Sequence, residues 1–514
     1  MMKGYELFED ALESLDLYPV FGNPGTTEIP MLRKIKGYIL TLHDSISVGM
    51  ADGAAQASGD AALVNLHDLP GVANSMAFIH TARINRSPVI ITAGQQDMRH
   101  AFYDPLLYHN LLSLVGDAVK YKIEVTQASD IAPAISRARS IALTPPMGPV
   151  FLSFPMNIMD QESAKVDLVE HNPNVNTVDN EAVREIVDII NHSSNPALVY
   201  GYEIDAFNAH DEAVDFAHAL GCPVYGEPLG NRAMFRSSDT SYAGDLLPAT
   251  TLINLKLLQH DLIVFVGGDI TLYPYLPSPL LPGKNILFVG MDLSNRIGRS
   301  YTMNPKLFLS AAKSMVSKKG NFRRADDYSF ATTVAREKRG MGLNFVMSTA
   351  RKNFEGYTIV DESISASPIV RSVMGYSHLR YFSARSGQLG WGIPAAMGIA
   401  TITDRVLLVI GDGSFMYTVQ SLWTAKRYDI PLKILVLNNG GYSILKSYSK
   451  SYYPGLENAD FFNLGLDIAS VARGFGIETG IAGADLEEMA WLKDGKEVKV
   501  LVVNVNSEIP KLFL

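Results

Sequence analysis

The chain has 514 residues, of which 47% are hydrophobic and 19% are charged, and its formal net charge is −9. This length predicts about three domains of ~150 residues, and the low charged fraction argues against extensive disorder. The negative balance, without a basic block, argues against general nucleic-acid binding and against binding to an anionic membrane surface.

The N-terminal segment and the cysteine content indicate the compartment. Glu6, Glu9, Asp10 and Glu13 follow a helical pattern, where a signal peptide would carry a cationic head and an apolar core. No apolar run reaches the ~18 residues needed to span a bilayer. Cys222 is the single cysteine, which excludes an intrachain disulfide and any CxxC metal site. We therefore expect a soluble, cytoplasmic protein with no membrane partner.

Short apolar runs separated by helical stretches predict a first α/β domain over residues 1–165. Its expected strands are 20–21, 38–40, 62–64, 89–91 and 150–153. The polar segment 163–180, which contains Pro173, predicts a linker.

A second α/β domain is expected over residues 181–320. It opens with an amphipathic helix at 182–190, and its expected strands are 197–200, 262–266 and 286–289. The charged stretch 318–327 predicts a second linker, and residues 340–514 form the third predicted domain. The first and third predicted domains have similar lengths and the same alternation of strand-like and helix-like segments, although no short repeat is visible.

Two apolar runs in the third domain end in polar residues. The run 406–410 is followed by Gly411-Asp412-Gly413-Ser414, and Asn439 lies 27 positions after Asp412 at the end of the run 432–437. Near-helical spacing of the apolar residues between them predicts a strand, a tight turn, a helix and a second strand. This succession is the βαβ unit of a parallel sheet.

The ends of these two strands carry the donors of a predicted metal site. Ligands of parallel sheets gather at the carboxyl ends of strands, where Asp412 and Asn439 offer the hard oxygen atoms that suit Mg²⁺. The helix that begins beside Gly413 and Ser414 offers backbone N–H groups to phosphate. The pattern predicts a Mg²⁺–diphosphate site. The alternative is a helix cap at Asp412 and an ordinary turn at Asn438-Asn439.

The segment 411–439 closely resembles the thiamine diphosphate motif, in which GDG is followed after roughly thirty residues by NN. That resemblance implies that Asp412, Asn439 and the backbone carbonyl of Gly441 hold Mg²⁺.

Further strings extend the resemblance in order over nearly the whole chain. Residues 22–28, 50–56, 66–67, 93–96 and 387–391 resemble the benzoylformate decarboxylase branch, and more broadly the pyruvate decarboxylase and acetolactate synthase group. The resemblance implies an α/β fold of three doubly wound parallel-sheet domains, which would be a pyrimidine-binding domain (1–165), a central domain (181–320) and a diphosphate-binding domain (340–514). It also implies a homodimer or homotetramer with the cofactor between the first domain of one subunit and the third domain of another.

One activating residue departs from the family pattern. The family uses a glutamate that hydrogen-bonds the pyrimidine N1′ of the cofactor, and the matching residue here is Asp44, which is one methylene shorter. Either the backbone lies closer, a water bridges the gap, or activation is weak. The alternative is that Asp44 only caps the helix that begins at Ser45.

The resemblance assigns further residues around the cofactor. Leu389 matches the apolar wedge that bends the cofactor, and the carbonyl of Gly387 is implied as the acceptor from N4′. Additional cofactor contacts are implied for Ser365, Gly413, Ser414, Tyr442 and Leu445.

Residues that hold the substrate and move protons are also implied. Thr26 matches a substrate-binding serine, and His67 matches a catalytic histidine, a residue whose ordinary pKa of about 6.5 suits proton transfer. The family's central-domain histidine is replaced by Pro274, which cannot transfer a proton, and Tyr273 or Tyr275 could substitute.

By matching position, Leu106, Leu107 and Tyr448 would line an apolar substrate pocket, with Leu445 beside them. Such a lining excludes water and favours loss of CO₂. Arg385 precedes the wedge string and is expected at the surface, the alternative being that it meets a substrate carboxylate.

We therefore predict a thiamine diphosphate- and Mg²⁺-dependent decarboxylase of a small 2-oxo acid, in which CO₂ departs and the enamine is protonated. A carboligase of acetolactate synthase type is the alternative, and Pro274 makes it more plausible. A non-catalytic cofactor-binding paralogue is the alternative from another class. FAD is unlikely, because residues 181–320 contain no glycine-rich nucleotide loop.

Overall fold

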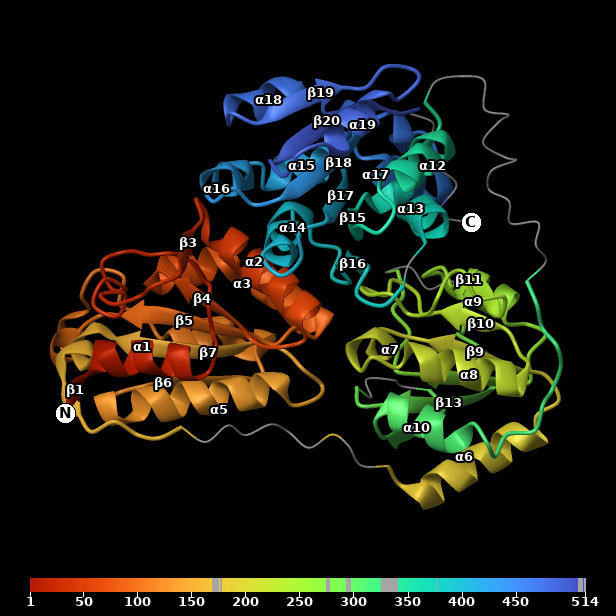
Figure 1. Cartoon of the computed structure of the whole chain (residues 1–514), viewed down its shortest axis with the longest axis horizontal. Helices are drawn as coiled ribbons and strands as arrows, with labels where there is room; N and C mark the ends of the chain where they lie inside the picture. Colours follow the sequence, from red (N-terminus) through yellow and green to blue (C-terminus); the bar gives the residue numbers. More distant parts are fainter. Residues whose placement is uncertain are drawn as a thin grey trace.

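The computed structural model describes residues 1–168, 175, 178–273, 278–292, 297–324, 341–375, 377–506 and 512. Three six-stranded sheets follow one another along the chain, and the three lobes they form are separated by colour in Figure 1. Every strand pair within these sheets is parallel, and helices cover the faces. The predicted architecture of three doubly wound parallel sheets is confirmed.

The first sheet has the strand order β3-β2-β4-β5-β7-β6. Its strands are β2 (Val20–Asn23), β3 (Tyr38–Leu40), β4 (Ala62–Leu66), β5 (Val89–Gln95), β6 (Tyr121–Glu124) and β7 (Val150–Pro155). Its helices are α1 (Gly4–Ser14), α2 (Asp44–Ser58), α3 (Asp68–Asn85), α4 (Leu111–Val115) and α5 (Ile131–Leu143), with 3₁₀ turns η1 (Met98–Tyr103), η2 (Gly116–Ala118), η3 (Ala128–Asp130) and η4 (Met156–Asp160). Strand β5 is buried along its whole length, as expected for a parallel strand covered on both faces.

A short antiparallel pair joins the two ends of the first domain. Strand β1 (Met2–Lys3) pairs with β8 (Glu162–Ser163), so the segment predicted as the first linker begins in a strand. Pro173 lies outside the described residues, as do residues 326–327 of the second predicted linker.

The central sheet has the order β11-β10-β9-β12-β13-β14. Its strands are β9 (Pro196–Tyr200), β10 (Val224–Gly226), β11 (Tyr242–Asp245), β12 (Leu262–Val266), β13 (Asn285–Gly290) and β14 (Arg299–Thr302), and its helices are α6 (Asn180–His192), α7 (Glu203–Ala206), α8 (His210–Leu220), α9 (Thr250–Lys256) and α10 (Pro305–Ala312). The sequence pattern missed β10, β11 and β14, because they are short and β14 is largely exposed and polar.

The third sheet has the order β16-β15-β17-β18-β20-β19. Its strands are β15 (Thr358–Glu362), β16 (Tyr381–Ser383), β17 (Val406–Gly411), β18 (Leu432–Asn438), β19 (Glu478–Ile481) and β20 (Lys499–Asn504). Its helices are α12 (Leu343–Asn353), α13 (Ser367–Met374), α14 (Gly392–Ala400), α15 (Asp412–Tyr417), α16 (Ser421–Arg427), α17 (Ser443–Tyr452), α18 (Ile468–Gly474) and α19 (Glu488–Lys493), with 3₁₀ turns η5 (Ile364–Ala366), η6 (Leu456–Asn458) and η7 (Asp460–Phe462).

The first and third sheets share one topology. If the strands of each sheet are numbered from 1 to 6 along the chain, the first and third sheets both have the order 2-1-3-4-6-5. The central sheet has the order 3-2-1-4-5-6. Ligands bind where such an order reverses, outside the carboxyl ends of the two strands involved. That rule points to the ends of β2 and β4 in the first domain and of β15 and β17 in the third.

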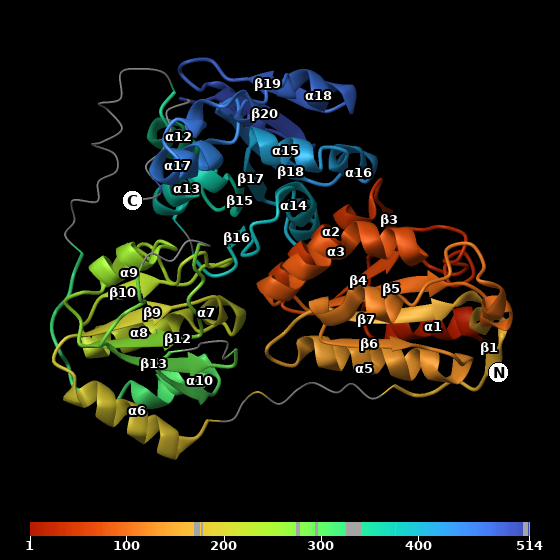
Figure 2. The same cartoon turned by 180° about the vertical axis from the view of Figure 1, so that it is seen from behind.

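The first and third domains pack through helices α2 and α14, which lie side by side in Figures 1 and 2. The contact is made by small residues: a Cβ on Gly53 would lie 2.2 Å from the carbonyl oxygen of Ala395, and a Cβ on Gly398 would lie 1.9 Å from that of Met50. Because backbone meets backbone here, glycine is required at both positions.

Among the residues that the structure describes, no helix combines the length and the apolar character needed to cross a bilayer.

Candidate functional site

Glu28 organises the polar residues at the switch point of the first sheet. Its carboxylate has no exposed surface and accepts hydrogen bonds from the backbone N–H groups of Gly25 (2.8 Å), Gly94 (2.8 Å) and Asp68 (3.2 Å). The Thr27 hydroxyl donates a further bond of 2.8 Å. A buried carboxylate with this many donors is fixed in place and fixes the loop around it.

His67 follows β4 and is oriented by Glu28. Its Nδ1 lies 2.8 Å from Oε2 of Glu28 and 3.3 Å from the hydroxyl of Thr27. Because an ionised carboxylate only accepts, we assign a proton to Nδ1, which leaves Nε2 available for chemistry. The hydrogen bond to Glu28 raises the pKa of His67. Thr26, the predicted substrate-binding hydroxyl, is exposed beside this pair.

Asp44 is a buried residue at the start of α2. Its Oδ2 accepts a long bond of 3.5 Å from the side chain of Asn23, and its Oδ1 has no hydrogen-bond partner within the described part of the chain. Burial raises the pKa of the Asp44 carboxyl. The alternative that Asp44 merely caps the helix is wrong, because the cap is His43, whose ring accepts from the N–H of Ser45 at 3.3 Å.

Asp412 and Asn439 lie at the ends of neighbouring strands β17 and β18 in the third sheet. Asp412 is buried, its Oδ1 accepts from the N–H of Gly413 at 2.9 Å, and its Oδ2 has no partner among the described residues. The Asn439 carboxamide oxygen accepts from the N–H of Gly441 at 3.2 Å. Burial raises the pKa of the Asp412 carboxyl because it disfavours the charged form. A cation beside the carboxylate would offset this cost.

The two asparagines of the NN pair have different positions. The side chain of Asn438 donates to Asn504 on β20 at 2.8 Å and so belongs to the sheet edge. Asn439 is half-buried and free of that pairing. The predicted ligand is therefore distinguishable from its neighbour by geometry.

Two of the predicted diphosphate contacts, Gly413 and Ser414, lie at the start of α15. Ser414 is buried there, and the ring of Tyr442 covers Gly413 so closely that a Cβ on Gly413 would lie 2.6 Å from it. Ser365 lies on η5, which packs against α17, the helix that carries the exposed Leu445.

The predicted substrate pocket lies partly at the surface of this chain. Leu106 is 84% exposed, Leu107 has a left-handed φ of 69°, and Tyr448 is half-buried. Burial raises the pKa of Tyr273, and the nearby Tyr448 raises it further. Tyr273, a residue of the central domain, therefore lies near the predicted pocket residue Tyr448. Pro274 and Tyr275 lie outside the described residues.

The close contacts of α2 with α14 and the adjoining Trp391 lie between Gly49 and Ala54, whereas Asp44 is the first residue of α2. Trp391, two residues after the wedge, bonds to Asp52, whereas Met50 lies against Gly398 near the far end of α14. Asp44 precedes Asp52 by two turns of α2, on the order of 12 Å along the helix.

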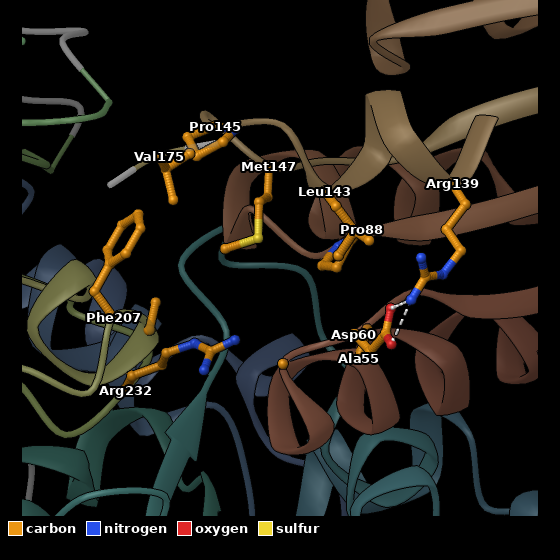
Figure 3. Close-up of a pocket in the computed structure, with 12 residues that line it drawn as sticks. Ala55, Asp60, Pro88, Arg139, Leu143, Pro145, Met147, Val175, Phe207 and Arg232 are labelled. Atoms are coloured by element: carbon orange, nitrogen blue, oxygen red, sulfur yellow. Dashed lines mark hydrogen bonds and ion pairs between the residues drawn. The ribbon is translucent and has the colours of Figure 1, made fainter. Parts of the chain in front are cut away.

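The cavity between the first and central domains is a different place. It has a volume of about 290 Å³ and is lined by residues that include Ala55, Asp60, Arg139, Phe207 and Arg232 (Figure 3). Ala55 lies near the C-terminal end of α2, about 16 Å along the helix from the start of α2. The Arg139 guanidinium faces Asp60 at 2.8 Å.

The switch point of the central sheet is occupied by two buried glutamates. Glu203 accepts from the N–H groups of Met291 (2.9 Å) and Asp292 (2.8 Å). Glu227 accepts from Tyr202 (3.0 Å) and also from Asp269 on the opposite loop. Two buried carboxyl groups therefore use the N–H groups that a nucleotide phosphate would need.

Arg385 is not a surface residue. It is buried, stacks over the ring of Tyr202 at 5.1 Å and faces Glu227 at 3.6 Å. The expected surface role is wrong, because the domain junction encloses the guanidinium beside a carboxylate that balances its charge.

A second group of possible metal donors joins the central and third domains. Oδ1 of Asp205 lies 3.2 Å from Nε2 of His210 and 2.9 Å from Nδ1 of His378. Arg232 already faces the other carboxylate oxygen at 3.6 Å, and its charge opposes a further cation. We interpret this group as a hydrogen-bonded link between domains.

Glu28 and Thr27 were not assigned roles from the sequence, although both lie in the string 22–28 that carries the resemblance. The available signal was Glu28 itself, a charged residue that ends a glycine-rich turn after a strand. Its partners His67 and Gly94 lie far along the chain, so only the folded structure identifies its role.

Three family models match the chain. They are the thiamine pyrophosphate enzyme N-terminal TPP binding domain (residues 2–110), the central domain (183–317) and the C-terminal TPP binding domain (369–503).

Full-length relatives match as well. The chain is 31% identical over 499 residues to a benzoylformate decarboxylase of Pseudomonas aeruginosa, covering 92% of each protein. It is 24% identical to an acetolactate synthase large subunit of Haemophilus influenzae, covering 99% of this chain and 94% of that protein. Similar solved structures include the benzoylformate decarboxylase of Polynucleobacter necessarius (TM-score 0.91) and the thiamine diphosphate-dependent 4-hydroxybenzoylformate decarboxylase of Rhodococcus jostii RHA1 (TM-score 0.92). Each of these two is 28% identical and covers 99% of this chain and 100% of the solved chain.

Proposed function

The chain belongs to the thiamine pyrophosphate enzyme family, and on that premise we propose that it is a Mg²⁺-dependent decarboxylase of a 2-oxo acid, similar to benzoylformate decarboxylase. One observation carries the proposal. Two buried carboxylates at the switch points of the first and third sheets, Asp44 and Asp412, each have one oxygen without a partner among the described residues. An unpartnered buried carboxylate oxygen is costly unless a ligand completes it.

The residues of the third domain fit a metal-bound diphosphate. Asp412, Asn439 and the carbonyl of Gly441 would hold Mg²⁺, which binds oxygen donors and keeps the rest of its coordination shell for phosphate and water. Ser414 and Ser365 would meet the phosphate oxygens. When bound, the thiazolium ring of the cofactor supplies the nucleophilic carbon and the electron sink that loss of CO₂ requires.

Asp44 would act on the pyrimidine ring of the cofactor. Its Oδ1 is the acceptor that this part of the chain leaves open, and burial raises its pKa, which favours sharing a proton with a ring nitrogen. Asn23 holds the other oxygen and so fixes the direction of the carboxylate.

His67 would hold and move a proton at Nε2. Glu28 fixes the ring through Nδ1 and favours the protonated form, so the histidine can donate to an oxygen or a carbon of the substrate. Thr26 offers an exposed hydroxyl beside it for the substrate carboxylate.

An apolar wall would exclude water from the reacting groups. Leu106, Leu107 and Tyr448 would line the substrate side, and a water-poor site favours loss of a charged carboxylate as CO₂. Tyr273 lies near Tyr448, and its hydroxyl could take the place of the central-domain histidine that the family has and this chain lacks.

We infer that the active unit is a homodimer or homotetramer with sites between copies. Asp44 lies on the order of 12 Å along α2 from Asp52, which bonds to Trp391 two residues after the predicted wedge, and this supports the arrangement. Apolar exposure supports it as well: Phe102 and Leu106 on the first domain are 90% and 84% exposed, and Phe461 on the third is 69% exposed. Replacing Phe102 by Asp should lower the mass measured by light scattering, and an unchanged mass would contradict this inference.

The proposal includes no flavin. Glu203 and Glu227 use the backbone N–H groups at the switch point of the central sheet, which supports this part of the proposal.

The reaction can be tested by supplying benzoylformate, other aryl 2-oxo acids and pyruvate with thiamine diphosphate and Mg²⁺, and by quantifying aldehyde and acyloin separately. Aldehyde as the main product, lost on chelation of Mg²⁺, is expected. Acyloin or acetolactate as the main product would favour a carboligase, the second candidate, which the acetolactate synthase relative supports. Cofactor binding without any product would favour a non-catalytic paralogue.

A further inference from the structure

The backbone around the wedge Leu389 forms a concave group of N–H donors. Gly390 adopts a left-handed conformation with φ of 86°, and Trp391 follows in the right-handed helical region with φ of −68° and ψ of −34°. Successive residues of opposite hand direct their N–H groups to one side and make an anion-binding nest. The same N–H groups begin helix α14, whose dipole also favours a negative charge.

Glu362, the last residue of β15, fills this nest. It is buried, its Oε1 accepts from the N–H of Gly390 and its Oε2 from the N–H of Gly392, both at 2.5 Å. A Cβ on Gly392 would lie 2.7 Å from Oε2 and 3.0 Å from the Cβ of Glu362, so a larger residue here would displace the carboxylate. Among the described residues, Glu362 forms no ion pair, and the nest is its counter-charge.

Two further contacts hold the same segment. The indole N–H of Trp391 donates to Asp52 on α2 at 2.7 Å, and the hydroxyl of Thr418 donates to the carbonyl of Gly390 at 2.7 Å. These contacts fix one side chain and one carbonyl. Among the residues that the structure describes, only Glu362 accepts from the N–H groups on both sides of Trp391, directly after the predicted wedge.

We propose that Glu362 is a positioning residue that sets the backbone of residues 390–392 and thereby the place of Leu389 against the cofactor. This inference rests on the proposed function for the role of Leu389. Both carboxylate oxygens are required, since each accepts a different N–H. Burial raises the pKa of Glu362 to about 8, whereas the N–H groups of Gly392, Gly390 and Trp391 favour the charged form.

The test replaces Glu362 by Gln, which keeps the shape but turns one acceptor into a donor that faces a backbone N–H. The matched control is Glu203→Gln in the central domain, because Glu203 is also buried, also accepts two backbone N–H bonds, and also has its pKa raised to about 8. Three quantities are measured in each full-length variant. They are amide hydrogen exchange of the apo protein, affinity for thiamine diphosphate with Mg²⁺, and the rate of C2–H exchange of the bound cofactor.

In Glu362→Gln, the amides of Gly390 and Gly392 should exchange about tenfold faster or more, because one of the two accepting oxygens is lost and a donor faces a backbone N–H in its place. The C2–H exchange rate should fall on the order of 10²-fold, which is the cost of misplacement by about 1 Å. Cofactor affinity should stay unchanged, because Asp412 and Asn439 are intact. Glu203→Gln should leave both the exchange at residues 390–392 and the C2–H rate at their wild-type values.

Unchanged exchange at Gly390 and Gly392, or an unchanged C2–H rate with loosened amides, would overturn the proposal. An equal loss of C2–H exchange in Glu203→Gln would overturn it too, by indicating a general effect of a neutralised buried carboxylate. If Glu362→Gln does not fold, Glu362→Asp is used, and a C2–H rate equal to the wild type there would count against the proposal. Failure of the wild type to bind cofactor would instead refute the proposed function, while the apo exchange would still report on the nest.

Discussion

Replacement of Asp44 by Asn is the most direct test of the proposed chemistry. The side chains have the same shape, and Asn23 can still bond to the oxygen that Asn keeps. What changes is Oδ1, the oxygen without a partner among the described residues, which can become an N–H₂ group that cannot accept a proton.

The expected loss can be set from the role of that oxygen. General acid–base catalysis contributes about 10²–10⁴-fold, which corresponds to about 3–5 kcal/mol in the barrier. Because burial raises the pKa of Asp44, the ionised residue destabilises the apo fold at neutral pH. Asp44→Asn should therefore lose activity without losing thermal stability, which a purely structural carboxylate would not do.

The assay measures C2–H exchange of the bound cofactor by acid quench and proton NMR, with the unfolding midpoint recorded in parallel. Ser45→Ala is the control, since it removes the hydroxyl that contacts His43 at 2.8 Å and loosens the helix start without altering Asp44. Wild-type exchange in Asp44→Asn, or an equal loss in Ser45→Ala, would refute the reasoning.

Three further predictions concern the metal site, the domain contact and pH. Asp412→Asn should abolish Mg²⁺-dependent cofactor binding in calorimetry. It should also raise the unfolding midpoint of the cofactor-free protein, because burial raises the pKa of Asp412 and the charged carboxylate therefore destabilises the native state at neutral pH. A lower unfolding midpoint in the variant would contradict this prediction. Gly398→Ala should lower the free energy of unfolding by about 1–3 kcal/mol, because the added methyl group overpacks against Met50. The control Gly474→Ala, whose added Cβ would meet nothing within 4 Å, should raise the free energy of unfolding by about 0.5–1 kcal/mol. Equal denaturation midpoints for the two variants would be inconsistent with the close contact at Gly398. Burial raises the pKa of Asp68 from 3.8 to about 6, so the native state binds this proton more tightly than the unfolded chain and the free energy of unfolding falls as pH rises through that interval. The free energy of unfolding of Asp68→Asn should therefore rise relative to that of the wild type by up to about 3 kcal/mol between pH 4 and about 7. Parallel pH profiles of stability for the two proteins would contradict this prediction.

The sequence located the strand ends at which a metal site is predicted, and the structure confirmed the sheet to which these strands belong. The apolar runs before Asp412 and Asn439 became neighbouring strands β17 and β18, because a continuous buried run followed by a glycine turn is a local signal. Short strands such as β14, which is largely exposed, gave no such signal and were missed.

The sequence could not show which residues support those ends. Glu28 and His67 are separated by 39 positions, and Glu362 and Gly390 by 28. Each pair forms because strands of one parallel sheet end at the same edge, so the partner depends on strand order rather than on spacing along the chain.

By itself, the sequence determined the fold class and the family resemblance, and it predicted roles for Asp44 and Asp412, because strand-forming runs, glycine turns and motif strings are local properties of the chain. Only the tertiary structure decided that Glu28 orients His67 and that Asp52 bonds to Trp391 across 339 positions. The physical reason is that such contacts follow from how whole sheets and helices pack, and packing brings together residues whose separation in sequence carries no information about their distance in space.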